Sequence, residues 1–299
     1  MKIKDNFHIY AIITIFFWSS AFVFTRLALR YFSPLTLGFL RYFAASASLL
    51  IFALFIKIKI PNRADFKWFI AAGFFGFSFY IIVFNIGSVT VSASTSSLII
   101  TTAPVITTLL ARIIYKEKLG IIQYIAIIIE FTGVGVLTLM NGIFSVNTGL
   151  IWLIMASIAF SIYNLLQRKL TKKYPALQSS IFSIWFGTVM LIIFLPASVA
   201  EIKIAPLMQM VYLLILGIFP SAIAYLTWTY AFSLSKNASS VTNYMFLTPF
   251  LTTLLGILLA GETPDLATII GGIIIMIGMF VYNFCDKIIL RINKERYTA

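Results

Sequence analysis

Eight residues with polar-tipped side chains lie well inside long apolar stretches of this sequence. They are Trp18, Tyr80, Tyr163, Asn164, Tyr225, Trp228, Asn243 and Tyr244. An unpaired hydroxyl, amide or indole N–H is costly in hydrocarbon, so these groups must face a protein interior or a wet cavity. Aromatic rings with a hydrogen-bonding tip suit an amphiphilic solute such as an amino acid. We predict that the set forms a substrate-binding cavity; for any single member, hydrogen bonding between helices is the alternative.

Two prolines, Pro104 and Pro249, interrupt apolar stretches near their middles. A proline inside a helix has no N–H to donate and frees the carbonyl four residues earlier, here those of Ile100 and Met245. Such breaks supply polar backbone and a hinge in the middle of a membrane. We predict a gating or hinge role for both prolines. The alternative is a tolerated kink that neighbouring Thr or Ser side chains stabilise.

Two charged residues also lie within apolar stretches. Arg41 follows Pro34 by seven residues, where it could attract a carboxylate or instead pair with a carbonyl. Glu130 is the only acidic residue in the middle of such a stretch, and an intramembrane carboxylate suggests proton coupling. The second half of the chain offers no counterpart carboxylate, since Ile275 stands at the matching place. Arg41 and Glu130 are therefore candidates for charge recognition or proton coupling.

Residues for catalytic and metal chemistry are scarce. The chain has one histidine, His8, near its start, and one cysteine, Cys285. A catalytic triad, a zinc site built on histidine or cysteine and an intramolecular disulfide all need more of these residues. We expect no bound metal, no cofactor and no enzymatic activity.

Composition indicates which elements position these side chains. Of the 299 residues, 61% are hydrophobic and 10% are charged, with a mean hydropathy of +1.02. Soluble domains average about 45–50% apolar and about 25% charged residues. Crossing a bilayer takes about 20 apolar residues per helix, and strand-type alternation is absent. The apolar stretches are residues 9–29, 35–56, 69–88, 92–114, 121–140, 149–166, 179–199, 210–233, 239–260 and 267–285.

The basic residues predict how these helices are oriented. If the N-terminus is cytoplasmic, 18 of the 22 Lys and Arg residues fall on the cytoplasmic side, and only Arg30 and Lys203 fall outside. Such a bias is the positive-inside pattern. We predict a multi-pass protein of the cytoplasmic membrane with cytoplasmic N- and C-termini. Topology then explains the net charge of +13 without a nucleic-acid partner.

The chain contains an internal repeat. Residues 93–117 and 238–262 align without a gap at an offset of 145 residues, with eight of 25 positions identical. Pro104 and Pro249 are among the identical pairs. The match is too long and too specific to arise from shared apolar composition.

The repeat divides the chain into two halves, residues 1–142 and 143–299, the second ending in a short basic cytoplasmic tail. Each half holds five predicted helices, an odd number, so the halves must cross the membrane in opposite directions. We predict an all-α integral membrane protein with ten transmembrane helices in two inverted five-helix repeats. Inverted repeats with interrupted helices at matching places are typical of secondary transporters.

Short motifs recur at characteristic places along the chain. They are Phe17-Trp18-Ser19-Ser20, Arg26-Leu27-Ala28, Pro34, Arg41-Tyr42 and the repeated segments 93–117 and 238–262. Together they resemble the drug/metabolite transporter superfamily, in its ten-helix EamA-type branch, over about residues 8–285. The family pattern commonly has Gly after the first Trp, where this chain has Ser19. The resemblance implies export, or sometimes uptake, of small polar metabolites through a central cavity lined by helices 1, 3, 4, 6, 8 and 9.

These observations predict a secondary transporter in a lipid bilayer that moves a small-molecule substrate, an amino acid or similar amphiphile, by alternating access, most simply as export. A ten-helix inverted pair can enclose the pathway as a monomer. Two alternatives stay open. A flippase-like, lipid-handling protein would show a lateral opening, and a membrane-embedded enzyme would need a nucleophile with a base, or a metal cluster, at membrane depth.

Overall fold

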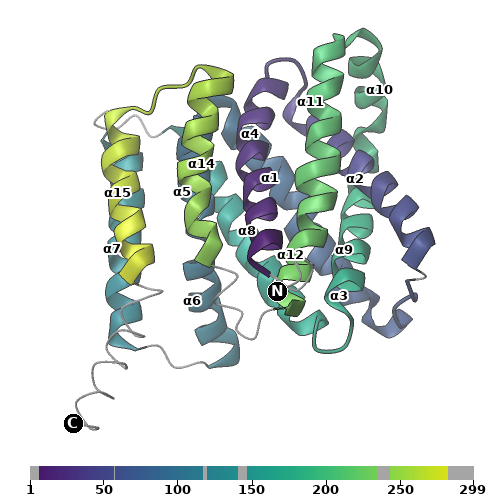
Figure 1. The fold of residues 1–299 in the computed structure, drawn as a ribbon, viewed down its shortest axis with the longest axis horizontal. Coiled ribbons are helices and arrows are strands. Elements are labelled where there is room, and N and C mark those ends of the chain that lie inside the picture. Colours follow the sequence, from purple (N-terminus) through teal and green to yellow (C-terminus); the bar gives the residue numbers. More distant parts are fainter. Residues whose placement is uncertain (1–6, 57, 117–119, 141–146, 235–242, 282–299) are drawn as a thin grey trace.

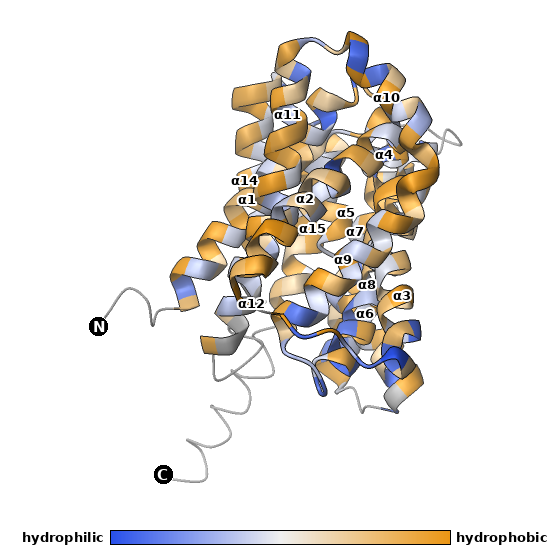
Figure 2. Cartoon of the chain, turned by 90° about the vertical axis from the view of Figure 1, so that its right-hand side faces the viewer, coloured by the Kyte–Doolittle hydropathy of each residue, from blue (hydrophilic) through white to orange (hydrophobic). Residues whose placement is uncertain are grey.

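The computed structural model describes residues 7–56, 58–116, 120–140, 147–234 and 243–281. The elements of this described part are all helical. Seven helices are long and apolar enough to cross a membrane, and three shorter apolar helices accompany them at Ile121–Leu137, Leu247–Ala260 and Leu266–Phe280. The helices stand side by side (Figure 1), with hydrophobic flanks and hydrophilic residues gathered at the two ends of the bundle (Figure 2). The all-α membrane fold predicted from composition is confirmed.

The first half of the chain forms five helical segments. These are α1 (Phe7–Ala28); α2 (Pro34–Ile56); the continuous helix of η2 (Arg63–Asp65), α3 (Phe66–Gly73), η3 (Phe74–Ser78) and α4 (Phe79–Thr90); the broken pair α5 (Ala93–Ile100) and α6 (Ala103–Tyr115); and α7 (Ile121–Leu139).

The second half repeats this order. Its segments are α8 (Thr148–Leu170); the continuous helix of α9 (Ala176–Met190), η4 (Leu191–Phe194) and α10 (Leu195–Ile204); α11 (Leu207–Ile218), η5 (Phe219–Ile223) and α12 (Ala224–Leu234); η6 (Asn243–Phe246), α14 (Leu247–Leu255) and η7 (Gly256–Ala260); and α15 (Leu266–Phe280).

Short polar side chains begin several of these helices. Ser92 accepts a hydrogen bond from the Thr95 N–H at the start of α5, and Asp265 does the same for the Thr268 N–H at the start of α15. Such caps satisfy backbone donors that a helix leaves unpaired in its first turn. The boundaries of the apolar stretches are therefore set by local chemistry that the sequence carries.

The internal repeat has a structural counterpart in two wide helical turns. The π-helical turns η3 (Phe74–Ser78) and η5 (Phe219–Ile223) lie 145 residues apart, the offset of the repeat. Such turns are rare and often occur at functional sites. The helix contacts also repeat between the halves. Helix α1 of the first half packs on α12 and α14 of the second, and its counterpart α8 packs on α4 and α6 of the first. The division at residues 142 and 143 stays a prediction, because residues 141–146 lie outside the described part.

Helices α7 and α15 pack against each other backbone to backbone. A Cβ atom on Gly133 would lie 2.7 Å from Ile275 Cγ1 and 2.8 Å from the Gly271 carbonyl oxygen. A Cβ atom on Gly135, on the same helix, would meet no atom within 4 Å. Only glycine fits at the first position, while the second is open.

This contrast predicts opposite effects for two neighbouring substitutions. Gly133→Ala should lower the free energy of unfolding by roughly 1–3 kcal/mol, the usual cost of overpacking. Gly135→Ala should leave stability unchanged or raise it slightly, because Ala favours helix over Gly. Thermal unfolding midpoints of the two purified variants in detergent measure the difference. Equal midpoints would contradict the close α7–α15 contact.

Candidate functional site

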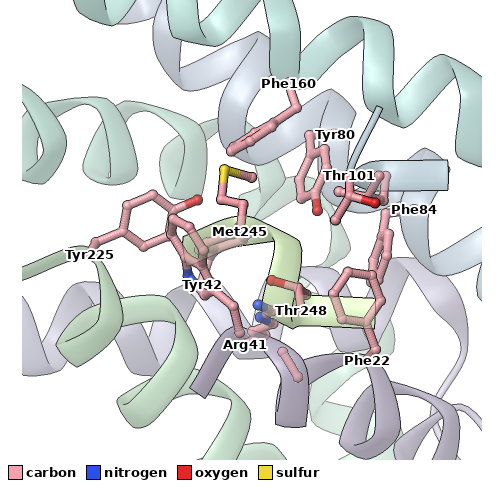
Figure 3. A pocket seen from close by; sticks show the side chains of 13 residues that line it. Phe22, Arg41, Tyr42, Tyr80, Phe84, Thr101, Phe160, Tyr225, Met245 and Thr248 are labelled. Atoms are coloured by element: carbon pink, nitrogen blue, oxygen red, sulfur yellow. The ribbon is translucent and has the colours of Figure 1, made fainter. Parts of the chain in front are cut away.

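A cavity of about 60 Å³ lies at the centre of the bundle, between helices of both halves. Its wall is made of Trp18, Ala21, Phe22, Arg41, Tyr42, Tyr80, Phe84, Ile100, Thr101, Phe160, Tyr225, Met245 and Thr248. These residues belong to α1, α2, α4, α5, the turn after α5, α8, α12, η6 and α14. Figure 3 shows aromatic side chains around the cavity, with the polar groups of Arg41, Tyr80, Tyr225 and Thr248 among them. Helix α2 was not in the predicted lining set and contributes Arg41 and Tyr42.

Three of the eight predicted binding residues line the cavity: Trp18, Tyr80 and Tyr225. The Trp18 indole Nε1–H donates to the Pro220 carbonyl at 3.2 Å. This carbonyl belongs to the wide turn η5. The Trp18 ring centre lies 5.6 Å from that of Tyr225 and 5.1 Å from that of Trp228. The π-helical turn thus helps to hold an aromatic wall in place.

The other predicted binding residues lie beside or away from the cavity wall. Tyr163 is buried and packs edge-on against Phe77, with ring centres 5.1 Å apart. Asn164 donates to Thr107 Oγ1 at 3.4 Å, and the Tyr244 hydroxyl forms a hydrogen bond with the His8 ring. The Asn243 side chain lies outside what the structure describes. None of these contacts tests a role in binding, which stays a prediction.

Asn164 forms a hydrogen bond between helices that has a counterpart at the matching place in the other half of the chain. Its counterpart in the first half is Ser19, whose carbonyl accepts from Thr252 Oγ1 at 3.4 Å, as Asn164 bonds Thr107. Ser19 Oγ also donates to the Thr248 carbonyl at 3.4 Å. The serine that departs from the family pattern is therefore fully buried and bonded at the α1–α14 contact.

Both prolines begin new helices next to the cavity. Pro104 is the second residue of α6, after the turn that ends α5, and Pro249 is the third residue of α14, after the 3-10 turn η6. The residues four positions earlier, Ile100 and Met245, both line the cavity. The breaks therefore bring irregular backbone to the site, as the sequence predicts. Their role as hinges stays a prediction.

Arg41 reaches the cavity from α2. The residue is 6% exposed, and its Nε–H donates to Ser221 Oγ at 2.6 Å. The guanidinium carbon lies 5.7 Å from the centre of the Tyr42 ring. Ser221 belongs to η5, so the same wide turn that accepts from Trp18 also positions Arg41.

Glu130 lies away from the cavity. The residue is 1% exposed, and a Cβ atom placed on Gly278 would lie 2.5 Å from Glu130 Cγ, so the carboxyl is enclosed between α7 and α15. Within the described residues, neither carboxyl oxygen has a hydrogen-bond partner. Glu130 and Arg41 are thus in different environments.

Several residues that line the cavity, and Ser221, which contacts Arg41 beside it, were not among the predicted site residues. Ser221 follows Pro220 inside an apolar stretch, and Thr248 precedes Pro249, so each has a proline neighbour that could have marked it. Phe22, Phe84 and Phe160 carry no such signal, because phenylalanine is frequent throughout the chain.

Two polar clusters lie at opposite ends of the helix bundle. At the end where α1 finishes, Glu262 accepts from Arg26 Nε at 3.2 Å and from the Ala93 N–H at 2.8 Å. The Arg26 Nη1–H also donates to the carbonyls of Ser88 and Val89 at 2.7 and 2.5 Å. This cluster joins the ends of α1 and α4, the start of α5 and the turn after η7.

At the other end, Asp65 pairs with Lys173, Nζ to Oδ2 at 2.5 Å, and accepts from the Tyr174 hydroxyl. The Tyr174 hydroxyl in turn accepts from the Asn62 N–H at 3.2 Å. Hydrogen bonding to Asp65 raises the pKa of Lys173 above its ordinary value. This second cluster joins the start of α3 to the segment after α8.

Metal ligation finds no support in the described part of the chain, where no three His, Cys, Asp or Glu side chains gather. The cavity wall offers aromatic surfaces, hydroxyl groups and one guanidinium. Such an arrangement can bind a small amphiphilic solute.

The sequence pattern of the EamA-like transporter family matches this chain twice, over residues 6–139 and 147–284. An uncharacterized transporter of Bacillus subtilis, YdfC, is 33% identical over 279 residues, which cover 93% of this chain and 89% of its own. A probable terminal-alkyne amino-acid exporter of Streptantibioticus cattleyicolor is 29% identical over 272 residues, 91% of each chain.

The fold also matches a solved crystal structure. The two structures share a TM-score of 0.60 and 17% sequence identity, over 93% of this chain and 97% of the other. At that identity the likeness concerns the fold alone.

Proposed function

Because the chain belongs to the EamA-like transporter family, we propose that it is a secondary transporter that exports a small amphiphilic metabolite, an amino acid or a close relative, by alternating access. Family membership and the apolar helices make it a multi-pass membrane transporter. The amino-acid class is supported by the relative from Streptantibioticus cattleyicolor, which is named as a probable exporter of a terminal-alkyne amino acid.

The central cavity is the observation that carries this proposal. It is lined by residues of one chain, lies between the two halves and combines apolar rings with a few polar tips, as ligand sites commonly do. Its small volume means that helices must move before a whole amino acid fits. A monomer is sufficient for this pathway.

The charges support cytoplasmic termini in the cell membrane. Figure 1 shows that α1 begins and α15 ends at the same end of the bundle. Because successive spans alternate in direction, the basic loops after α2 and α8 lie at that end, among them Arg63 and Lys173. The opposite end carries Glu201 and Glu262. Under the positive-inside rule, the basic end is cytoplasmic.

Alternating access then amounts to exchanging which end is closed. The Arg26–Glu262 cluster would close the outer end and the Asp65–Lys173 cluster the cytoplasmic end. The helix breaks before Pro104 and Pro249 lie between these ends, where they would act as hinges.

Counterflow in proteoliposomes tests the proposed function. Purified protein is reconstituted, loaded with one amino acid and offered labelled amino acids from a panel outside, with and without a pH gradient. At least one labelled amino acid should accumulate beyond protein-free vesicles. The export proposal fails if the whole panel gives the protein-free signal under both conditions.

Glu130→Gln tests whether the buried carboxyl carries proton coupling. We expect exchange to be retained and its response to a pH gradient to be unchanged, because Glu130 lies between α7 and α15 and not at the cavity. Thermal stability should be kept, because a carboxyl buried without a partner is uncharged and glutamine has a similar shape without charge. Loss of the pH response with exchange preserved would assign coupling to Glu130.

A further inference from the structure

The guanidinium of Arg41 is buried at the cavity without a neutralising partner. Its Nε–H is bonded to Ser221, but within the described residues the two terminal nitrogens have no hydrogen-bond partner and no carboxylate at ion-pair distance. Figure 3 shows these nitrogens beside Thr248. The residue as a whole is 6% exposed, and neither terminal nitrogen is among the fully enclosed polar atoms that lack a partner, so both are accessible from the cavity.

The acidic residues that the structure describes are all engaged elsewhere or distant. Asp65 pairs with Lys173, Glu262 with Arg26, and Glu201 accepts from Thr36 Oγ1 at 3.1 Å. Asp265 caps α15, and Glu130 lies between α7 and α15. Arg41 is the one charged residue of the cavity wall. The described cavity therefore carries a net positive charge.

A bound anion would satisfy this site. Leaving a buried charge unpaired is strongly unfavourable. The guanidinium holds several N–H groups in a planar fork that matches a carboxylate, and such charge-assisted pairs are short and strong. The Ser221 contact fixes Nε, so the terminal nitrogens are presented to the cavity in one orientation.

The positive charge occurs in one half only. The position 145 residues after Arg41 holds Phe186, so the repeat supplies no second guanidinium. The rest of the wall is largely aromatic, including Phe22, Phe84 and Phe160. A ligand that fits this asymmetric cavity has one negative group and an apolar body.

We propose that Arg41 binds the carboxylate of the transported molecule and makes the cavity selective for carboxylates over cationic analogues. This proposal rests on the proposed transport function and names the charge class of its substrate. Ser221 acts as a positioning residue, since it touches Arg41 and orients the fork.

Three phenyl compounds of similar shape test the charge preference. L-phenylalanine and 3-phenylpropionate carry a carboxylate, whereas L-phenylalanine amide carries only the ammonium group. Each is titrated into the full-length protein in detergent at constant salt, and the thermal unfolding midpoint gives the affinity. Both carboxylates should stabilise the wild type, and the amide should bind at least about tenfold more weakly.

Arg41→Gln should weaken carboxylate binding about tenfold or more, because a charge-assisted pair is lost. Arg41→Lys, which keeps the charge without the fork, should bind more weakly than wild type but still prefer the carboxylates over the amide. Arg30→Gln removes an exposed cation at the end of α1 and should behave as wild type.

Three outcomes overturn the inference: no stabilisation by either carboxylate, equal stabilisation by the amide, or unchanged carboxylate affinity in Arg41→Gln. If Arg41→Gln does not fold, loss of the carboxylate preference in Arg41→Lys overturns it. Binding that depends on Arg41 without counterflow would contradict only the transport proposal. Counterflow that accepts amide and carboxylate alike would contradict only the carboxylate site.

Discussion

Trp18→Ala is expected to reduce counterflow about tenfold or more, which corresponds to the loss of about 1.4 kcal/mol of interaction. The indole lines the cavity, donates to the Pro220 carbonyl at 3.2 Å and packs against Tyr225. Its removal takes away an aromatic wall for the substrate and leaves a carbonyl of η5 without its donor. Trp18→Phe keeps most of the ring and should retain part of the activity.

Trp185→Ala is the matched control. Trp185 is also half-buried and also donates its indole N–H to a backbone carbonyl, that of Ser46, at 3.3 Å. It lies between α9 and α2 and does not line the cavity. We expect this variant to lower the thermal midpoint but to exchange substrate at nearly the wild-type rate. If both alanine variants lose exchange equally at equal protein amounts, the prediction that Trp18 binds substrate is contradicted.

Glu262→Gln is expected to open the outer end of the bundle. Its carboxylate accepts from Arg26 and from the Ala93 N–H, and the pair is largely shielded, with 14% of the Glu262 side chain exposed. Removing the charge weakens a contact that, under the proposed alternating access, holds the outer end closed. Coupling of this kind is typically 1–3 kcal/mol, so the open population should rise about fivefold or more.

The fraction of protein that is open to the outside is measured by the reactivity of a thiol placed in the cavity. Thr101→Cys on a Cys285→Ser background places one thiol at the cavity wall. A membrane-impermeant reagent added from outside should react with it about fivefold faster when Glu262→Gln is also present.

Asp65→Asn weakens the opposite cluster and is the matched control for this measurement. It should raise reactivity from the cytoplasmic side, measured in inverted vesicles, and not from outside. Unchanged reactivity in both variants would show that neither cluster controls access.

The polar aromatic residues show how far the sequence could predict the site. Burial in hydrocarbon forces every hydroxyl and amide inward, so Trp18, Tyr80 and Tyr163 share the same sequence signal. Two of the three line the cavity, while Tyr163 packs against Phe77 one layer away. Whether a side chain faces the bundle interior is set by the sequence of its own helix. Facing the cavity depends on how neighbouring helices are rotated and spaced, which no single stretch encodes.

The two intramembrane charges show the same limit. Arg41 and Glu130 both lie in apolar stretches, and sequence reasoning treats them alike. The structure places Arg41 at the cavity, held by Ser221 from a distant part of the chain, and Glu130 against Gly278. Which one can meet a substrate depends on contacts between residues separated by about half the chain.

The amino-acid sequence by itself determined that this protein lies in a lipid bilayer, that it is helical, roughly where its membrane spans lie and that it contains a repeat. These follow from composition, the thickness of a bilayer and self-similarity, which are properties of consecutive residues. Only the tertiary structure decided which polar groups converge, because α1 meets α12 and α8 meets α4 across the two halves. It also revealed the wide turns η3 and η5, and η5 holds both Trp18 and Arg41 at the cavity.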